Sequence, residues 1–436
     1  MTAVPTPVPA LSVVTRPFAL SAPLLDYLDQ SQPLLWLRRG NGLVGHGEAL
    51  RLEFSGANRF ADASVTWREV AARAVVDDAV GVAGSGLVAL GTFAFDDESV
   101  ATSTLIVPSL VIGRRDGLAW VTRIALSSDT ATTDAATTDA SPPAPSSRTA
   151  VTEFGDPEPA NITGLARATF ASGTLSPAGY LDAVERAVDG IRHNGVSKIV
   201  VARDLTATLD SDAGLAPAIA SLAHGYPDCW NFAVDGFLGS SPETLVTVHR
   251  GTVTARVLAG SAARGADAAS DVEASIALAT STKDQDEHEF AVHSVVAALR
   301  SHGTVTASEV PFTLKLPNLW HLASDVEGTL SDGSTSLDLI AALHPTAAVA
   351  GTPTDAAIDA IRELEPFDRE RYAGPVGWVG ADGDGEWAIA LRSAQLAADG
   401  TITAWAGAGI VVDSVPQHEL AETTMKFRPI VEAFGG

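Results

Sequence analysis

The sequence is poor in cysteine and has no long apolar run. A single cysteine, Cys229, excludes an internal disulfide framework and is typical of proteins kept in a reducing compartment. No stretch approaches the roughly 18 uninterrupted apolar residues that a membrane-spanning helix needs. Residues Met1 to Ser12 lack the basic segment and apolar core of a secretory signal. We therefore expect a cytoplasmic protein with no membrane partner.

Positive charge is also scarce. The chain has 28 Lys and Arg against 53 Asp and Glu, a formal net charge of −25. Because phosphate-binding surfaces need clustered basic residues, we expect no nucleic-acid partner. Lysine is rarest of all, and a desolvated lysine, unlike arginine, can lose its proton and act as a base. The lysines are Lys198, Lys283, Lys315 and Lys426.

What the chain does have is length and apolar content. Its 436 residues, 46% of them hydrophobic, can build a large core. Composition divides it into a β-rich N-terminal lobe (1–126), a segment rich in Ser, Thr, Ala and Pro (127–160), and a longer region that carries the chemistry (161–436). The middle segment buries too little to fold, so we expect a disordered linker or loop.

Periodicity predicts an α+β protein, with large, mostly antiparallel sheets flanked by helices. The β-rich runs are joined mostly by turns of hairpin length, which argues against a doubly wound parallel sheet. Helices are predicted near Trp67–Val75, after the N-cap Ser176, over Asp284–Leu299 and over Gln417–Ala433. Strands are predicted at Leu34–Arg38, Gly47–Phe54, Gly86–Phe95, Thr104–Ile112, Gly117–Val121, Lys198–Leu205, Trp230–Phe237, Leu245–His249, Thr252–Ala259, Gly374–Trp378, Trp387–Gln395 and Ile402–Val412.

Two predicted helices begin with paired carboxylates. Asp284 and Glu287 lie three residues apart on one face, and Glu419 and Glu422 repeat that spacing, with Lys426 one turn further along. Two such pairs could form an all-oxygen site for Mg²⁺. The alternative is that the acids only complement the helix N-termini.

Glycine turns and one arginine are further candidates. Ala406-Gly407-Ala408-Gly409 follows a strand and Leu258-Ala259-Gly260-Ser261 ends one, so either could present backbone N–H groups to an anion. Arg392 interrupts an apolar strand, where it could grip a carboxylate or pair with a structural acid.

Eight short motifs, taken in order, resemble the chorismate-binding enzymes, which include isochorismate, salicylate, anthranilate and aminodeoxychorismate synthases. The resemblance is strong from Tyr180 to the C-terminus and looser in the N-terminal lobe. The motifs are Ser241-Pro242-Glu243-Thr244-Leu245, Leu258-Ala259-Gly260-Ser261, Lys283-Asp284-x-x-Glu287-His288, His321-Leu322, His344-Pro345-Thr346, Tyr372-Ala373-Gly374-Pro375-Val376-Gly377-Trp378, Ala390-Leu391-Arg392 and Ala406-Gly407-Ala408-Gly409-Ile410-Val411.

The resemblance implies a two-lobed chorismate-binding fold, Mg²⁺ as cofactor and chorismate as substrate. By that likeness Glu287 and Glu422 are the principal metal ligands, and Asp284 and Glu419 complete the shell directly or through water. Asp284 stands where several relatives have Glu, which shortens its reach. Substrate contacts are implied for Gly260, Ser261, His321, Ala348, Tyr372, Arg392, Gly407 and Lys426.

Lys198 and Glu243 indicate which reaction of the family to expect. Lys198 stands where water-activating members keep a lysine, whereas ammonia-using members tend to have glutamine. A lysine works as a base at neutral pH only when burial lowers its pKa by roughly 2–3 units from ~10.4. Glu243 would be the matching acid, and it needs a raised pKa to protonate the departing C4 hydroxyl. The resemblance thus implies an isomerase that adds water at C2 of chorismate.

Ala348 and Ser261 imply that the product, isochorismate, is released intact. Members that go on to eliminate pyruvate typically have Thr or Ser at the position of Ala348. A salicylate synthase remains the nearest alternative, followed by an anthranilate or aminodeoxychorismate synthase subunit and by an inactive chorismate-binding homologue. We expect a monomer with no glutaminase subunit, and the sequence leaves open whether the product feeds menaquinone, siderophore or salicylate synthesis.

Overall fold

The computed structural model describes residues 9–127, 156–160, 162–164, 166–193, 195–209, 214–315 and 319–436. The side chains of Lys283, Glu287 and Leu319 lie outside this description. Most of the predicted linker, residues 128–155, also lies outside it.

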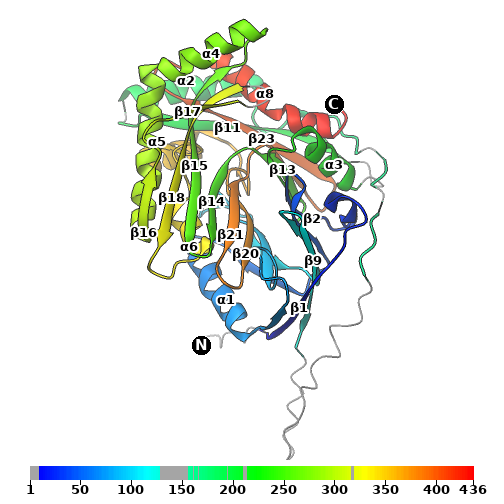
Figure 1. Ribbon diagram of the computed structural model, residues 1–436. Coiled ribbons are helices and arrows are strands. Elements are labelled where there is room, and N and C mark those ends of the chain that lie inside the picture. Colours follow the sequence, from blue (N-terminus) through cyan, green and yellow to red (C-terminus); the bar gives the residue numbers. More distant parts are fainter. Residues whose placement is uncertain are drawn as a thin grey trace, which may run out of the picture.

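Within the described residues, strands form two large sheets that lie face to face (Figure 1). The thirteen-stranded sheet runs in the order β10 (Ala171–Ser172), β11 (Lys198–Thr208), β23 (Thr401–Ile410), β22 (Ser393–Leu396), β13 (Phe237–Ser241), β12 (Trp230–Val234), β2 (Leu34–Arg38), β3 (Asn41–His46), β8 (Leu110–Arg115), β9 (Leu118–Leu126), β1 (Leu11–Pro17), β5 (Val75–Asp78), with β19 (Gly351–Thr352) paired to β11. The ten-stranded sheet runs in the order β16 (Gly303–Ala307), β18 (Leu319–Leu330), β15 (Thr252–Ala263), β14 (Thr244–His249), β21 (Gly385–Ile389), β20 (Pro375–Gly380), β6 (Val88–Thr92), β7 (Ser103–Val107), β4 (Leu50–Phe54), with β17 (Phe312–Lys315) paired to β18.

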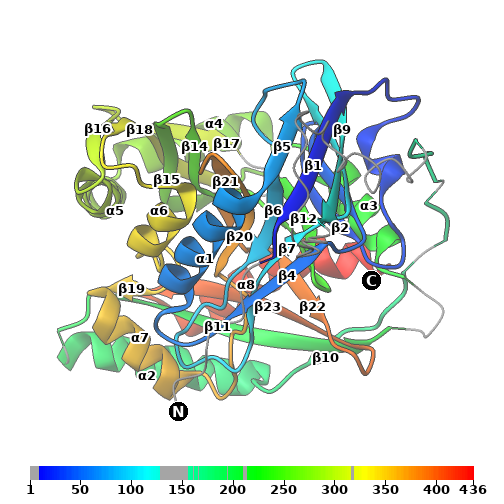
Figure 2. The same ribbon diagram turned by 90° about the horizontal axis from the view of Figure 1, so that it is seen from below.

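Helices cover the outer faces of both sheets. α1, α5 and α6 pack against the ten-stranded sheet, and α3 and α8 pack against the thirteen-stranded one (Figure 1). α2 and α7 lie beside β11 (Figure 2). The helices are α1 (Arg59–Arg73), α2 (Pro177–His193), α3 (Ala216–Gly225), α4 (Ala268–Thr280), α5 (Thr282–Arg300), α6 (Ser336–Leu343), α7 (Thr354–Leu364) and α8 (Pro416–Ala433), with a short 3-10 helix η1 (Leu24–Tyr27).

The predicted fold class is confirmed. All strand pairs between described residues are antiparallel except β1 with β5. Each sheet contains strands from before residue 127 and strands from after residue 197. The two parts of the chain meet where β2 pairs with β12 and where β6 pairs with β20. The predicted division into a lobe over 1–126 and a catalytic region over 161–436 stays a prediction.

The inner faces of the sheets meet in one large apolar core. Trp36 of the thirteen-stranded sheet and Trp378 of the ten-stranded sheet are both fully buried. Their indole N–H groups each donate to the same Glu386 carboxylate oxygen at 3.0 Å, so the polar edges of both rings are satisfied inside the core.

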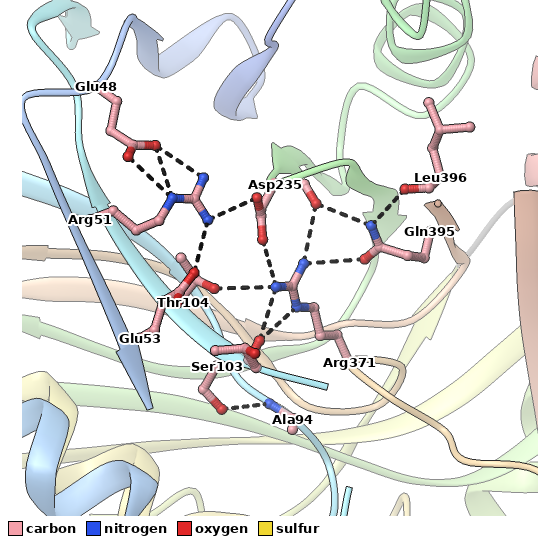
Figure 3. A network of polar contacts seen from close by, with 11 residues as sticks. Glu48, Arg51, Glu53, Ala94, Ser103, Thr104, Asp235, Arg371, Gln395 and Leu396 are labelled. Carbon is pink, nitrogen blue, oxygen red and sulfur yellow. Dashed lines mark hydrogen bonds and ion pairs between the residues drawn. The ribbon is translucent and has the colours of Figure 1, made fainter. Parts of the chain in front are cut away.

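A polar network also joins the two sheets (Figure 3). Asp235, in the turn between β12 and β13, accepts from Arg371 at 2.6 Å and from Arg51 of β4 at 3.0 Å. The same Arg371 guanidinium donates to Thr102 O and to Thr104 Oγ1 next to and within β7. The network therefore ties a hairpin of one sheet to three segments associated with the other.

Three predicted strands are wrong in their extent, for local backbone reasons. The predicted strand Thr104–Ile112 is two strands, β7 of the ten-stranded sheet and β8 of the thirteen-stranded one, which are separated at Pro108, a residue without a backbone N–H for a strand ladder. The predicted strand Trp230–Phe237 is a hairpin, because Asp235 and Gly236 both have positive φ (55° and 74°) and form a two-residue turn. The predicted strand Trp387–Gln395 is broken at Arg392, which has a φ of 51° and lies between β21 and β22. Arg392 is therefore in a connection, not on a strand as predicted.

Candidate active site

A cavity of about 330 Å³ brings the predicted site residues together. Glu287 belongs to α5, but its side chain lies outside the described part of the structure. A larger cavity of about 820 Å³ elsewhere contains none of the predicted residues. The other thirteen predicted residues all line the smaller cavity: Lys198, Glu243, Gly260, Ser261, Asp284, His321, Ala348, Tyr372, Arg392, Gly407, Glu419, Glu422 and Lys426.

Glu243 and Arg392 lie where the chain passes from one sheet to the other. β13 belongs to the thirteen-stranded sheet and β14 to the ten-stranded one, and Glu243 lies between them. A neighbouring segment of the same chain crosses in the opposite direction, from β21 of the ten-stranded sheet through Arg392 to β22 of the thirteen-stranded sheet. The two crossings are held side by side, because Ile389 N–H donates to the Glu243 carbonyl and Ser240 N–H donates to the Arg392 carbonyl, both at 3.1 Å.

The environment of Glu243 favours its protonated form. Burial raises the pKa of this carboxyl group to about 7, although the positive charges of Lys198, Arg392 and Lys426 act to lower it. A carboxyl group with a pKa near neutrality can serve as a general acid.

Lys198 begins β11 and extends over a glycine of the neighbouring strand. A Cβ atom at Gly409 of β23 would lie 2.8 Å from Cε of Lys198, which is closer than such atoms approach in folded proteins. Glycine at this position therefore leaves the room that the lysine side chain occupies.

Basic and hydroxyl groups gather around Gly407 of β23. Lys426 Nζ donates to the Gly407 carbonyl at 2.8 Å and pairs with Glu422 at 2.7 Å. A Cβ atom at Gly407 would lie 3.3 Å from the Tyr372 hydroxyl oxygen. Among the described residues nothing forms a hydrogen bond or ion pair with the Arg392 guanidinium, so this group can bind an anion in the cavity.

A β-bulge shapes the opposite wall. Gly260 has a φ of 75°, and the pairing of β15 with β18 shifts register between Ala259 and Ser261. His321 of β18 contacts the Gly260 carbonyl at 3.3 Å, and burial together with nearby Lys426 lowers the pKa of His321 to about 4. His321 is therefore neutral at physiological pH.

The acidic wall suits a hard divalent cation in its donor chemistry. Asp284, Glu419 and Glu422 all line the cavity and offer carboxylate oxygens. Burial and then the negative charge of Glu422 raise the pKa of Glu419, and a bound cation would relieve that repulsion. Within the described ranges, which do not include the side chain of the predicted ligand Glu287, no three His, Cys, Asp or Glu side chains already converge as ligands.

Sequence reasoning missed several residues that build the site. Asp413, Ser414 and His418 line the cavity where β23 leads into α8, and only the polar turn after a β-rich run could have suggested them. His288, quoted as part of a motif but given no role, is buried and contacts Ala259 O at 3.2 Å and Ser324 Oγ at 2.8 Å. These contacts dock α5 on β15 and β18.

The chain resembles proteins of one family along most of its length. The family described as chorismate binding enzyme matches residues 24–435. Isochorismate synthase DhbC of Bacillus subtilis is 40% identical over 276 residues, which cover 59% of this chain and 68% of that protein. Isochorismate synthase MenF of B. subtilis is 35% identical over 262 residues, covering 59% of this chain and 55% of the relative.

A solved structure agrees with this likeness. The menaquinone-specific isochorismate synthase MenF of Escherichia coli has a TM-score of 0.77 at 25% identity, covering 97% of this chain and 95% of that one. No helix within the described ranges is long and apolar enough to cross a bilayer. With seven of the eight motifs contributing residues to one cavity and a family match over 24–435, this chain belongs to the chorismate-binding enzymes.

Proposed function

We propose that this protein is an isochorismate synthase, an isomerase that adds water at C2 of chorismate and releases the hydroxyl group from C4. The observation that carries the proposal is the pairing of Lys198 with Glu243 in one cavity, where the pKa of Glu243 is raised to about 7. A base and a protonated acid that face one ring are what the reaction requires.

Lys198 and Glu243 divide the proton transfers between them. Lys198 takes a proton from water as the oxygen bonds to C2, the ring double bond shifts, and the C4–oxygen bond breaks. Glu243 gives its proton to the departing oxygen, which leaves as water. One water enters and one leaves, so substrate and product are isomers.

The basic groups around Gly407 hold the enolpyruvyl carboxylate in this proposal. The Arg392 guanidinium forms no hydrogen bond or ion pair with the described residues, and Tyr372 and Lys426 both lie against Gly407. Gly260, Ser261, His321 and Ala348 would contact the ring and its substituents from the other walls of the cavity.

Magnesium belongs to the proposal as cofactor. Glu287 and Glu422 would be its principal ligands, with Asp284 and Glu419 completing the shell directly or through water. When bound, the ion would neutralise the ring carboxylate of chorismate and so strengthen its binding in an acidic cavity.

Salicylate synthase is the second candidate, and Ala348 disfavours it. A methyl group at this wall offers no hydroxyl to assist loss of the enolpyruvyl group. The remaining parts of the proposal are a cytoplasmic location, with which the single cysteine agrees, and a monomer that needs no glutaminase subunit.

Purified protein with chorismate and Mg²⁺ tests the function directly. We expect isochorismate as the product, identified by chromatography, no activity after treatment with EDTA, and recovery when excess Mg²⁺ is added. Appreciable pyruvate or salicylate fluorescence would favour the lyase, and no consumption of chorismate would refute both candidates.

A further inference from the structure

One edge of β11, the strand that begins with Lys198, lacks a continuous partner strand. β23 pairs with its other edge continuously from Ile199 to Thr208. On this edge β19 covers only Lys198 and Ile199, and β10 covers only Leu205 and Thr206. Val200 and Ala202 lie in the gap, and both are buried, so their backbone groups need partners from elsewhere.

Two side chains from the segment after α7 fill that gap. The Glu365 carboxylate accepts from the Ala202 N–H at 2.7 Å, and the Arg369 guanidinium donates to the Val200 carbonyl at 2.8 Å. Arg369 also donates twice to Glu365, at 2.8 Å and 2.6 Å. The two side chains are only 1% and 2% exposed, so the pair replaces a missing strand inside the protein.

The same guanidinium reaches the loop that carries Ala348. Its third nitrogen donates to the Val349 carbonyl at 2.8 Å, while the Val200 N–H donates to the Ala350 carbonyl at 2.8 Å. Arg369 therefore bridges β11 and this loop.

The backbone carbonyl of Arg369 accepts a hydrogen bond from the Tyr372 N–H at 2.9 Å. Three segments that supply cavity residues (those of Lys198, Ala348 and Tyr372) thus meet at one arginine.

We propose that Glu365 and Arg369 are positioning residues, which set the spacing between Lys198 and the Ala348 loop for the water-adding step. This inference rests on the proposed function. Neither side chain lines the cavity, so the pair acts through the backbone groups that it holds. A buried ion pair suits this role because its hydrogen bonds are directional, whereas apolar packing would allow the segments to slide.

The charge state of the pair agrees with this role. Burial acts to lower the pKa of Arg369, but the Glu365 carboxylate keeps it above its ordinary value, so the guanidinium stays charged. Each of its donors can then hold a carbonyl or carboxylate oxygen at all working pH values.

Arg369→Lys is the first test, with Arg59→Lys as its matched control. Lysine keeps the charge beside Glu365, but its N–H donors all leave one nitrogen, so it cannot span the acceptors that three separate nitrogens of Arg369 reach. Arg59 is equally buried and donates to the carbonyls of Gly56, Ala94 and Phe95, none of which lines the cavity.

For Arg369→Lys we expect kcat for isochorismate formation to fall at least about tenfold while KM for chorismate stays within about twofold. Hydrogen exchange in the peptide 197–204 should become faster. Arg59→Lys should lower the melting temperature similarly and leave kcat and this peptide unchanged.

Glu365→Gln is the second variant, which serves if Arg369→Lys does not fold. Glutamine keeps an oxygen for the Ala202 N–H, so its kcat should lie between those of wild type and Arg369→Lys. Equal losses of kcat in Arg369→Lys and Arg59→Lys, or an unchanged kcat in a folded Glu365→Gln, would overturn the positioning role. Wild-type protein assayed alongside separates the two proposals. If the wild type itself lacks isochorismate synthase activity, the proposed function is refuted, whereas the positioning role of Glu365 and Arg369 is judged from the variants.

Discussion

Glu243 combines a chemical role with a cost in stability. Burial keeps its carboxyl group protonated near neutral pH, and the positive charges of Lys198, Arg392 and Lys426 offset this only in part. A protonated carboxyl group can deliver a proton to a leaving hydroxyl. The same burial opposes folding once the group ionises, so chemistry and stability conflict at this residue.

Replacing Glu243 with Gln should therefore stabilise the protein in a pH-dependent way. The folded state binds the Glu243 proton more tightly, since the pKa rises from 4.5 to about 7 on folding. The stability that this proton supplies is complete below pH 4.5 and is lost as pH rises through 7. Unfolding by urea should show the two proteins alike near pH 4 and Glu243→Gln more stable by at most roughly 3 kcal/mol at pH 8. A difference independent of pH would contradict the raised pKa.

Lys198→Ala should remove the proposed base without disturbing substrate binding. General acid–base catalysis contributes typically 10²–10⁴-fold, so we expect kcat to fall at least about 100-fold. Isochorismate formation is measured by chromatography at saturating chorismate and Mg²⁺. Lys315→Ala is the control, because Lys315 is an exposed lysine outside the cavity. Undiminished conversion by Lys198→Ala would rule out the proposed mechanism.

Among the secondary structure elements, β15 and α5 meet at the Gly260 bulge. A Cβ atom at Gly260 would lie 3.2 Å from Cβ of Asp284, in the first turn of α5. The bulge therefore allows β15 to approach the acidic start of α5. The spacing of the proposed metal ligands thus depends on the backbone conformation at Gly260.

Gly260→Ala should weaken Mg²⁺ activation beyond any loss of stability. Alanine at a φ of 75° costs about 1–2 kcal/mol and also presses on Asp284. Gly251→Ala is the matched control, since Gly251 has a φ of 76° and nothing within 4 Å of an added Cβ. We expect the Mg²⁺ concentration for half-maximal rate to rise at least about threefold in Gly260→Ala only. Equal values in both variants would mean that the bulge does not affect the metal site.

The sequence predicts α5 and α8 well, but it yields no prediction for α3, α4, α6 and α7, nor for the connections between the sheets. Helical spacing gave α5 and α8 nearly to their ends, because 3.6-residue periodicity is a local property. It could not show that the chain changes sheets at Glu243 and Arg392, because a crossing is defined only by which distant strands pair. The cavity residues came from motif likeness, whereas Glu365 and Arg369 serve backbone groups far away in sequence and carry no local pattern.

Across the whole molecule, Asp235 links the two sheets through charge (Figure 3). Burial acts to raise its pKa, but Arg371 and then Arg51 hold the pKa below the ordinary value of 3.8. The stability that this carboxylate supplies is therefore present above about pH 4 and is lost as pH falls through the lowered pKa.

Asp235→Asn should destabilise the protein by about 2 kcal/mol at neutral pH, because the nearly buried Arg371 loses its counter-charge. Asparagine tolerates the positive φ of this turn, so the backbone should not change. Thermal unfolding measured from pH 3 to pH 7 should show the difference shrinking at the acid end. Asp228→Asn, which breaks an exposed pair with Arg39, should cost less than about 1 kcal/mol at every pH. A similar small effect for Asp235→Asn would mean that the sheets do not depend on this link.

The pairing of β2 with β12 and of β6 with β20 has a consequence for dividing the gene. Neither the part before residue 127 nor the part after residue 156 can supply all the backbone hydrogen bonds of these four strands alone. Each part would therefore expose unpaired strand edges and tend to aggregate. Produced together in one cell, the same two fragments offer each other the missing neighbours. The enzyme is thus suited to a split reporter, in which recovered conversion of chorismate shows that the two fragments have associated.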